Sequence, residues 1–187
     1  MKIKKPTVYY IVSAALTVTL SLLLRFLYKV TPGIISGILS SANNSIFEQM
    51  KSVLWPCVLF MIMHEVVFHN GNFEEHSLYL LLSLFSVPLS IMIIRKLQVE
   101  NLTAVNVISS ILGIIVFFTL CYVNGTIRIP LSMFEIVSAP ILMIAVIIIF
   151  IAFSFNPPQN ELFFDPINKL YGMPHLQAYI TGQQVYT

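Results

Sequence analysis

Charge is scarce in this chain of 187 residues, because only 10% of the residues are charged whereas 57% are hydrophobic. Soluble domains carry roughly 25% charged residues, so the polar groups of this chain cannot cover a surface exposed to water. The formal net charge is +2, which is too small for the clustered basic surface of a nucleic-acid-binding protein. The composition therefore excludes an ordinary soluble domain, a disordered chain and a nucleic-acid partner, and it indicates an integral membrane protein.

Cysteine is also rare, and the common short catalytic motifs are missing. Cys57 and Cys121 each lie inside an apolar run with no close cysteine or histidine partner. We therefore interpret both as packing residues and not as a disulfide or a metal pair. The sequence contains no G-x-S-x-G, Walker or G-x-G-x-x-G motif, so most catalytic templates are absent. We predict no metal and no cofactor.

Long apolar runs dominate what is present. A spanning helix needs about 20 apolar residues, and the chain has room for about five such helices with short loops. We predict an all-α, polytopic membrane helix bundle over residues 1–155. Its helices are expected at about 7–30, 45–69, 75–94, 102–123 and 130–155. Pro56, Pro88 and Pro140 lie inside three of these helices, and each is expected to free a backbone carbonyl one turn earlier.

The last segment, residues 156–187, has a different character from the bundle. It holds four of the ten prolines and several charged residues, so it is predicted to be an extramembrane tail that packs on the bundle. Lysine and arginine counts do not fix the orientation, and we favour a cytoplasmic N-terminus because the first helix often dominates. The tail would then face outward from a multi-pass protein of the cell (plasma) membrane.

The most informative polar residues lie at the start of the second predicted helix. Ser45 and Glu48 have the S-x-x-E spacing of a capping box, and Lys51 follows Glu48 on the same helix face. One interpretation is an interfacial helix start with a cap, an ion pair and Trp55 as an aromatic anchor. The other is a polar pocket within the bundle, because ionisable groups at membrane depth are costly and usually functional. The small residues of the preceding segment 34–44, a surface loop or a re-entrant segment, favour the pocket.

A second polar group lies near the end of that helix. His64, Glu65 and His69 superficially resemble a zinc-protease helix, but its two histidines are spaced i and i+4. Here the spacing is i and i+5, which turns the imidazoles apart. We therefore predict an interfacial polar belt and no metal site.

Most of the remaining charges are explained by helix ends. Ser132 and Glu135 repeat the S-x-x-E spacing and predict a cap for the last helix. Four charged residues stay without such an explanation: Glu48, Lys51, Glu65 and Asp165.

Two segments of the chain resemble an uncharacterised family of small bacterial membrane proteins, a domain of unknown function. The family pattern N-E-S-x-W-E-H-x-K corresponds to residues 43–51, with Asn44, Phe47 and Gln49 at three departures. The family ends in a segment like Y-P-P-x-x-P-L-F-x-D-P-x-x-x-x-Y-G, which corresponds to residues 156–172. The resemblance implies a bacterial inner-membrane protein of about five helices, without an established activity.

The resemblance links two segments that are distant in sequence, and we hypothesise that the tail folds back over the start of the second helix. A contact between Asp165 and Lys51 would then form a polar cap on the bundle. The residues expected to bind a ligand are Asn44, Ser45, Glu48, Lys51 and Asp165.

The sequence leaves three functions open. The first is binding or transport of a small or lipid-like ligand at this polar pocket. The second is an enzyme on a membrane-embedded, lipid-linked substrate, with Glu48 or Asp165 as general base. The third is an accessory subunit, whose last helix, 130–155, packs on a membrane protein partner. Membrane lipids are expected partners in every case.

Overall fold

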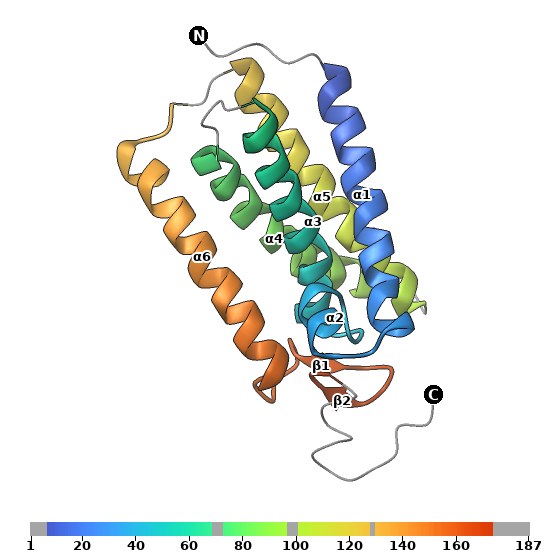
Figure 1. Cartoon of the computed structure of the whole chain (residues 1–187). Helices are drawn as coiled ribbons and strands as arrows, with labels where there is room; N and C mark the ends of the chain where they lie inside the picture. Colours follow the sequence, from blue (N-terminus) through green and yellow to red (C-terminus); the bar gives the residue numbers. More distant parts are fainter. Residues whose placement is uncertain (1–6, 69–72, 97–100, 128–129, 174–187) are drawn as a thin grey trace.

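The computed structural model describes residues 7–68, 73–96, 101–127 and 130–173. Six helices and a two-stranded ribbon follow one another in this part of the chain (Figure 1). They are α1 (Thr7–Val30), α2 (Ile34–Leu39), α3 (Ile46–Phe68), α4 (Phe73–Lys96), α5 (Leu102–Ile127), α6 (Met133–Phe155), β1 (Phe164–Asp165) and β2 (Leu170–Tyr171). All the helices except α2 are long and apolar enough to cross a membrane, which makes 5 candidate spans. The predicted all-α membrane bundle is confirmed, and the protein is an integral, multi-pass membrane protein.

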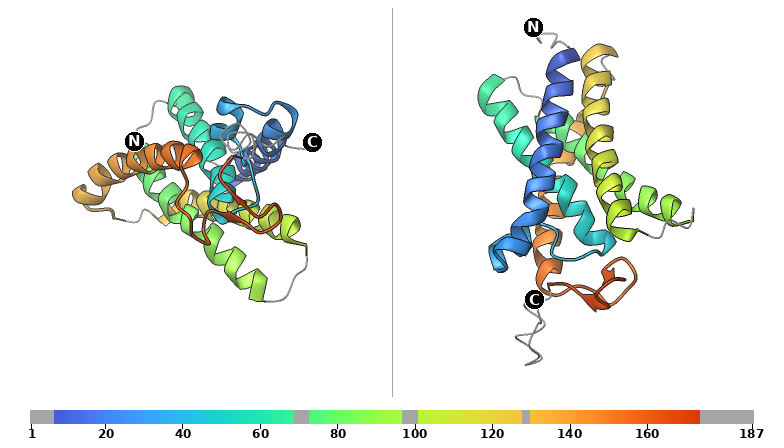
Figure 2. Two further views of the ribbon diagram at one scale, coloured as in Figure 1. Left: turned by 90° about the horizontal axis from the view of Figure 1, so that it is seen from below. Right: turned by 90° about the vertical axis from the view of Figure 1, so that its right-hand side faces the viewer.

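The centre of the bundle is formed by α3, α4 and α5, which pack against one another (Figures 1 and 2). Between 44% and 50% of the most apolar window of these three helices is buried. The corresponding windows of α1 and α6 are only 17% buried, so these two helices lie at the periphery with most of their apolar side chains facing outward. In a membrane, lipid chains cover such faces.

The main differences from the sequence prediction are one additional short helix and the end of α5. The segment from residue 34 contains the short helix α2, which was not predicted as helical. Helix α5 continues to Ile127, past the end expected near residue 123. Within the helix, Gly125 makes room for Tyr10 of α1, because a Cβ there would lie 2.8 Å from the hydroxyl oxygen of Tyr10. The stop predicted around His69 lies outside the described residues.

The carbonyl freed by one helical proline has a partner. Pro56 lacks the N–H that would bond to the carbonyl of Ser52. That carbonyl accepts a hydrogen bond from Oγ of Ser21 on α1, at 2.6 Å. Ser21 belongs to a buried stripe of small polar residues on α1, with Ser13 and Thr17. Small side chains of this kind let helices approach closely in a membrane, so the same stripe packs α1 on α3 and satisfies the backbone.

The predicted cap of α6 is confirmed. Oγ of Ser132 accepts a hydrogen bond from the backbone N–H of Glu135 at 3.3 Å, and Oε2 of Glu135 accepts one from the backbone N–H of Ser132 at 2.7 Å. This reciprocal pair satisfies two N–H groups that a helix start otherwise leaves without partners.

The chain returns from α6 to the bundle through a tight ribbon below α2 and the start of α3 (Figures 1 and 2). In this ribbon Phe164 pairs with Tyr171 and Asp165 pairs with Leu170. Gly172 follows with a φ of 67°, a left-handed conformation that residues with a Cβ rarely adopt.

Replacing Gly172 by Ala is expected to lower the free energy of unfolding by about 1–2 kcal/mol from the conformational cost alone. A Cβ at Gly172 would also lie 2.8 Å from Cγ of Pro157, which adds to the loss. Thermal unfolding in detergent measures the effect. Gly33→Ala is the control, because Gly33 has an extended φ of 179° and its added Cβ would meet only Oγ of Ser36, at 3.9 Å. Equal melting temperatures for the two variants would contradict the prediction.

Candidate functional site

A group of buried polar side chains lies at the end of the bundle where α2, the start of α3, the start of α5 and the ribbon meet. We call this group the polar cluster. All its members are at least nine-tenths buried, and they are Ser40, Asn43, Ser45, Glu48, Gln49, Lys51, Asn106, Ser110 and Asp165. Burial of so many polar atoms inside a membrane protein is costly unless they bind one another or a ligand.

The centre of the polar cluster is an ion pair between Glu48 and Lys51 on the first turns of α3. Oε1 of Glu48 lies 2.7 Å from Nζ of Lys51, and the two side chains are 2% and 0% exposed. Nζ of Lys51 also donates a hydrogen bond to the carbonyl of Gly37 at 2.9 Å. Oε2 of Glu48 accepts one from the backbone N–H of Ala42 at 2.8 Å. The pair predicted from the i, i+3 spacing therefore forms, and it ties α3 to the segment that contains α2.

The start of α3 forms only half of the expected capping box. Oγ of Ser45 accepts a hydrogen bond from the backbone N–H of Glu48 at 3.3 Å. The backbone N–H of Ser45 donates instead to Oδ1 of Asn43, at 2.7 Å. The reason is that both carboxylate oxygens of Glu48 are already engaged, by Lys51 and by Ala42.

Asp165 reaches the polar cluster through the backbone of Asn44. Its carboxylate accepts hydrogen bonds from the backbone N–H groups of Asn44 (3.1 Å), Ile167 (2.8 Å) and Asn168 (3.2 Å), and from the Asn168 side chain (2.7 Å). The expected contact between Asp165 and Lys51 is not formed, because Lys51 is held by Glu48 and Gly37 while Asp165 is held by these four N–H donors. That expectation is corrected.

Other hydrogen bonds join the last segment to the start of α3. The backbone N–H of Phe47 donates to the carbonyl of Leu162 at 3.0 Å. The side-chain amide of Asn43 donates to the carbonyl of Gly172 at 2.7 Å. The ring of Phe163 packs against that of Phe47, with centroids 4.5 Å apart. Together with Asp165, these contacts bring the two segments that carry the family resemblance into one structural unit.

Two amide side chains of the polar cluster were missed by the sequence argument. The amide nitrogen of Gln49 donates to Oγ of Ser41 and to the carbonyl of Asn43, each at 3.0 Å. The amide nitrogen of Asn106 on α5 donates to the carbonyl of Asn44 at 3.3 Å. A signal for Asn106 was present in the sequence, because it shares a helix face with Ser109 and Ser110 inside an otherwise apolar run.

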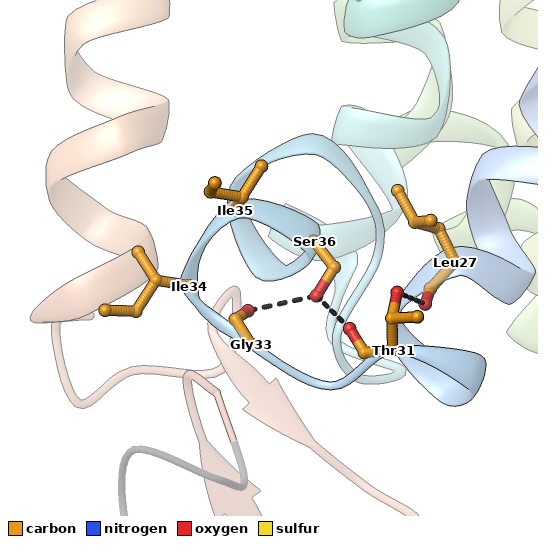
Figure 3. Close-up of a pocket in the computed structure, with 6 residues that line it drawn as sticks. All are labelled: Leu27, Thr31, Gly33, Ile34, Ile35 and Ser36. Carbon is orange, nitrogen blue, oxygen red and sulfur yellow. Dashed lines mark hydrogen bonds between the residues drawn. The ribbon is translucent and has the colours of Figure 1, made fainter.

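An open pocket of about 430 Å³ lies beside the polar cluster, between the end of α1 and α2 (Figure 3). Its lining is largely apolar and consists of Leu27, Thr31, Gly33, Ile34, Ile35 and Ser36. Oγ of Ser36 donates to the backbone carbonyls at the base of the pocket, with 2.5 Å to Thr31 and 3.1 Å to Gly33. Ser36 precedes Gly37, whose carbonyl binds Lys51. The pocket wall is therefore one residue away from the buried ion pair.

The second predicted polar group lies at the other end of α3. His64 is buried, and its imidazole centroid lies 4.9 Å from that of His76 on α4. Glu65 is half-buried, and His69 lies outside the described residues. Cys57 and Cys121 are buried free thiols. Within residues 7–68, 73–96, 101–127 and 130–173, no three His, Cys, Asp or Glu side chains are grouped to hold a metal ion.

Comparison with known proteins gives a family but no activity. Residues 1–173 match the model of a family of unknown function, DUF6512. The match runs from α1 through the ribbon, and it confirms the resemblance to an uncharacterised family. Searches of the curated proteins and of the solved structures found no match to this chain.

Proposed function

The chain belongs to this family of unknown function, and from its own geometry we propose that it binds a lipid-like ligand in the pocket between α1 and α2. The observation that supports this proposal is the buried Glu48–Lys51 pair, whose ammonium group bonds to the residue next to the pocket wall. A buried ion pair adds little net stability, because apolar side chains of similar volume stabilise a core equally well or better. Ionisable groups at membrane depth are costly and are usually functional, which favours a role of this pair in a site.

The pocket has the chemistry of an amphipathic ligand. Leu27, Ile34 and Ile35 offer an apolar surface to an alkyl chain. Oγ of Ser36, which donates to the carbonyls of Thr31 and Gly33, keeps acceptor capacity for a donor at the polar end of the ligand. The pocket is open, so a lipid chain can enter without passing through the bundle.

The polar cluster is proposed to hold this pocket in shape. Lys51 fixes the carbonyl of Gly37 and hence the wall formed by α2. Glu48 holds Lys51, and it also holds the backbone of the segment after α2 through the N–H of Ala42. Asn44, Ser45 and Asp165 fix the start of α3 from the other side. We propose the bacterial plasma membrane as the location, where phospholipids of the surrounding leaflet supply such ligands.

Filling the pocket tests this proposal. Leu27→Trp places a large ring in the pocket, so the amount of co-purified lipid is expected to fall at least about tenfold, which corresponds to 1.4 kcal/mol of lost affinity. Native mass spectrometry of the protein released from detergent measures the retained lipid. Leu16→Trp is the matched control, because Leu16 is 66% exposed on α1 and does not line the pocket. Equal lipid retention by both variants and the wild type would contradict a site in this pocket.

The two rival functions receive less support from the geometry. A general base needs a carboxylate oxygen that can accept a substrate proton, but Glu48 and Asp165 each accept several hydrogen bonds from the protein. An accessory subunit needs a face for its partner, and the exposed apolar side chains of α6 are equally suited to lipid. Ligand binding therefore remains the function that the structure favours.

A further inference from the structure

Two buried amide oxygens of the polar cluster lack a hydrogen-bond donor. Within the part of the chain that the structure describes, no donor reaches Oε1 of Gln49 or Oδ1 of Asn106. Both residues are 0% exposed. A buried oxygen without a partner loses about 1–3 kcal/mol of solvation, so two neighbouring ones indicate a bound group that supplies the missing interaction.

The two amide groups bind the same short loop. The nitrogen of Gln49 donates to the carbonyl of Asn43, and the nitrogen of Asn106 donates to the carbonyl of Asn44, which is the next residue. Helices α3 and α5 also touch at this level, where Oγ of Ser110 lies 3.5 Å from the carbonyl of Gln49. These bonds fix the orientation of each amide, because a flipped amide would place its oxygen against a carbonyl. The two amides are therefore anchored to consecutive residues of one loop, beside a contact between α3 and α5.

Two hydroxyl groups add to the same region. Oγ of Ser52 and Oγ of Ser109 are buried and also lack a partner among the described residues. Ser52 follows Gln49 by three residues on α3, and Ser109 follows Asn106 by three residues on α5, so each lies near its amide neighbour on the helix surface. The available atoms are uncharged oxygens, which bind hard cations.

The fully buried charged side chains of the polar cluster are the carboxylates of Glu48 and Asp165 and the ammonium group of Lys51. Glu48 is paired with Lys51, whereas Asp165 is held by N–H donors. Arg95, in the last turn of α4, is a further, partly buried cation at this end of the bundle. Asp165 bonds to the backbone of Asn44, the residue whose carbonyl holds Asn106. A cation near Asn106 would be attracted to the carboxylate of Asp165 across this one residue, because the low dielectric of the interior makes attraction strong.

We propose that Gln49 and Asn106 bind a monovalent hard cation such as Na⁺ between α3 and α5, with Ser52 and Ser109 as further oxygen ligands. The uncharged ligand set favours a monovalent over a divalent ion, because divalent ions in proteins are usually held by carboxylates. Membrane transporters use side-chain and backbone oxygens of broken helices for the same purpose. This site shares no residue with the proposed lipid pocket, and the two proposals are tested by separate measurements.

The test is the melting temperature of the full-length protein in detergent, followed by the fluorescence of its 1 tryptophan, Trp55, in NaCl, KCl or choline chloride at equal ionic strength. At about ten times the Kd, the bound cation is expected to raise the wild-type melting temperature by roughly 3–6 °C over choline. Asn106→Leu is expected to abolish this difference. Asn124→Leu, which removes an amide at the other end of α5, is expected to keep it.

A second variant covers the case in which Asn106→Leu does not fold. Asn106→Asp retains an oxygen ligand and adds a negative charge, so its stability is expected to depend more strongly on the cation than that of the wild type. Binding of radioactive ²²Na⁺ to the wild type, displaced by unlabelled NaCl, measures the site directly. Identical melting in all three salts together with no displaceable ²²Na⁺ would overturn the proposal. Lipid retention in the native mass spectrum is measured separately and is expected to be the same in NaCl and choline.

Discussion

Replacing Glu48 by Gln is expected to lower the free energy of unfolding by about 3–5 kcal/mol, because it removes one partner of a buried ion pair. The ammonium group of Lys51 is fully buried, and after the change it has uncharged acceptors only, the carbonyl of Gly37 and the amide oxygen of the new side chain. The backbone N–H of Ala42 also loses its charged acceptor. Thermal and chemical unfolding in detergent measure the loss. Trp55 reports on it directly, since its indole N–H donates to the carbonyl of Ile38 at 2.7 Å.

The matched control removes both charges. The double variant with Glu48→Gln and Lys51→Met is expected to be clearly more stable than Glu48→Gln alone, because no unpaired charge stays buried. Glu135→Gln changes an exposed carboxylate in the cap of α6 and is expected to have little effect. Equal losses for the single and the double variant would show that hydrogen-bond geometry, and not the buried charge, determines the stability of this region.

The expected loss of stability in variants of Glu48 also affects the choice of variants for testing ligand binding. A variant of Glu48 or Lys51 that loses lipid could do so because α2 has lost its anchor at Gly37. Leu27→Trp avoids this ambiguity, since Leu27 lines the pocket and makes none of the side-chain hydrogen bonds of the polar cluster. The two sets of variants therefore separate the integrity of the polar cluster from occupancy of the pocket.

Most of the fold could be predicted from the sequence because spanning helices are set by local hydrophobicity. The first helix has the predicted range, 7–30, and the last helix ends at Phe155 as predicted. The prediction is wrong where the helix makes contacts with residues that are distant in the sequence. Helix α5 continues through Gly125, which packs against Tyr10 of α1, and α2 forms beside α1 and α6 in a segment too short to span. Neither contact is visible in the local sequence.

The candidate site could be predicted only where its contacts are local. Glu48 and Lys51 are three residues apart, so a helix places them together whatever else the chain does. Asp165 accepts a hydrogen bond from the N–H of Asn44, which is 121 residues away in the sequence. The side chain of Asn106 donates to the carbonyl of Asn44 from 62 residues away. Such contacts depend on how α3, α5 and the ribbon pack. The family resemblance suggested that the tail meets α3, but it did not identify the atoms involved.

Replacing Asp165 by Asn is expected to lower the free energy of unfolding by about 2–4 kcal/mol, because several N–H groups lose a charged acceptor. An amide nitrogen in place of Oδ2 would face the N–H donors of Asn44 and Asn168. Local stability is expected to fall both in the ribbon, which contains Asp165, and near Asn44, to which Asp165 is bonded. Hydrogen–deuterium exchange should rise in the ribbon, at residues 164–171, and also in residues 40–48 before and within the start of α3. Mass spectrometry of peptic peptides measures both regions.

Asn168→Ala is the matched control, since it removes one donor to Asp165 from within the ribbon and leaves the bond to Asn44 intact. It is expected to increase exchange in the ribbon alone. If Asp165→Asn likewise affected only the ribbon, the tail would be a separate unit that merely rests on the bundle. If both regions respond, Asp165 couples the ribbon to the segment that holds Glu48, Lys51 and the pocket wall. The tail would then be part of the site, because the lipid pocket and the proposed cation site both depend on the loop that Asp165 fixes.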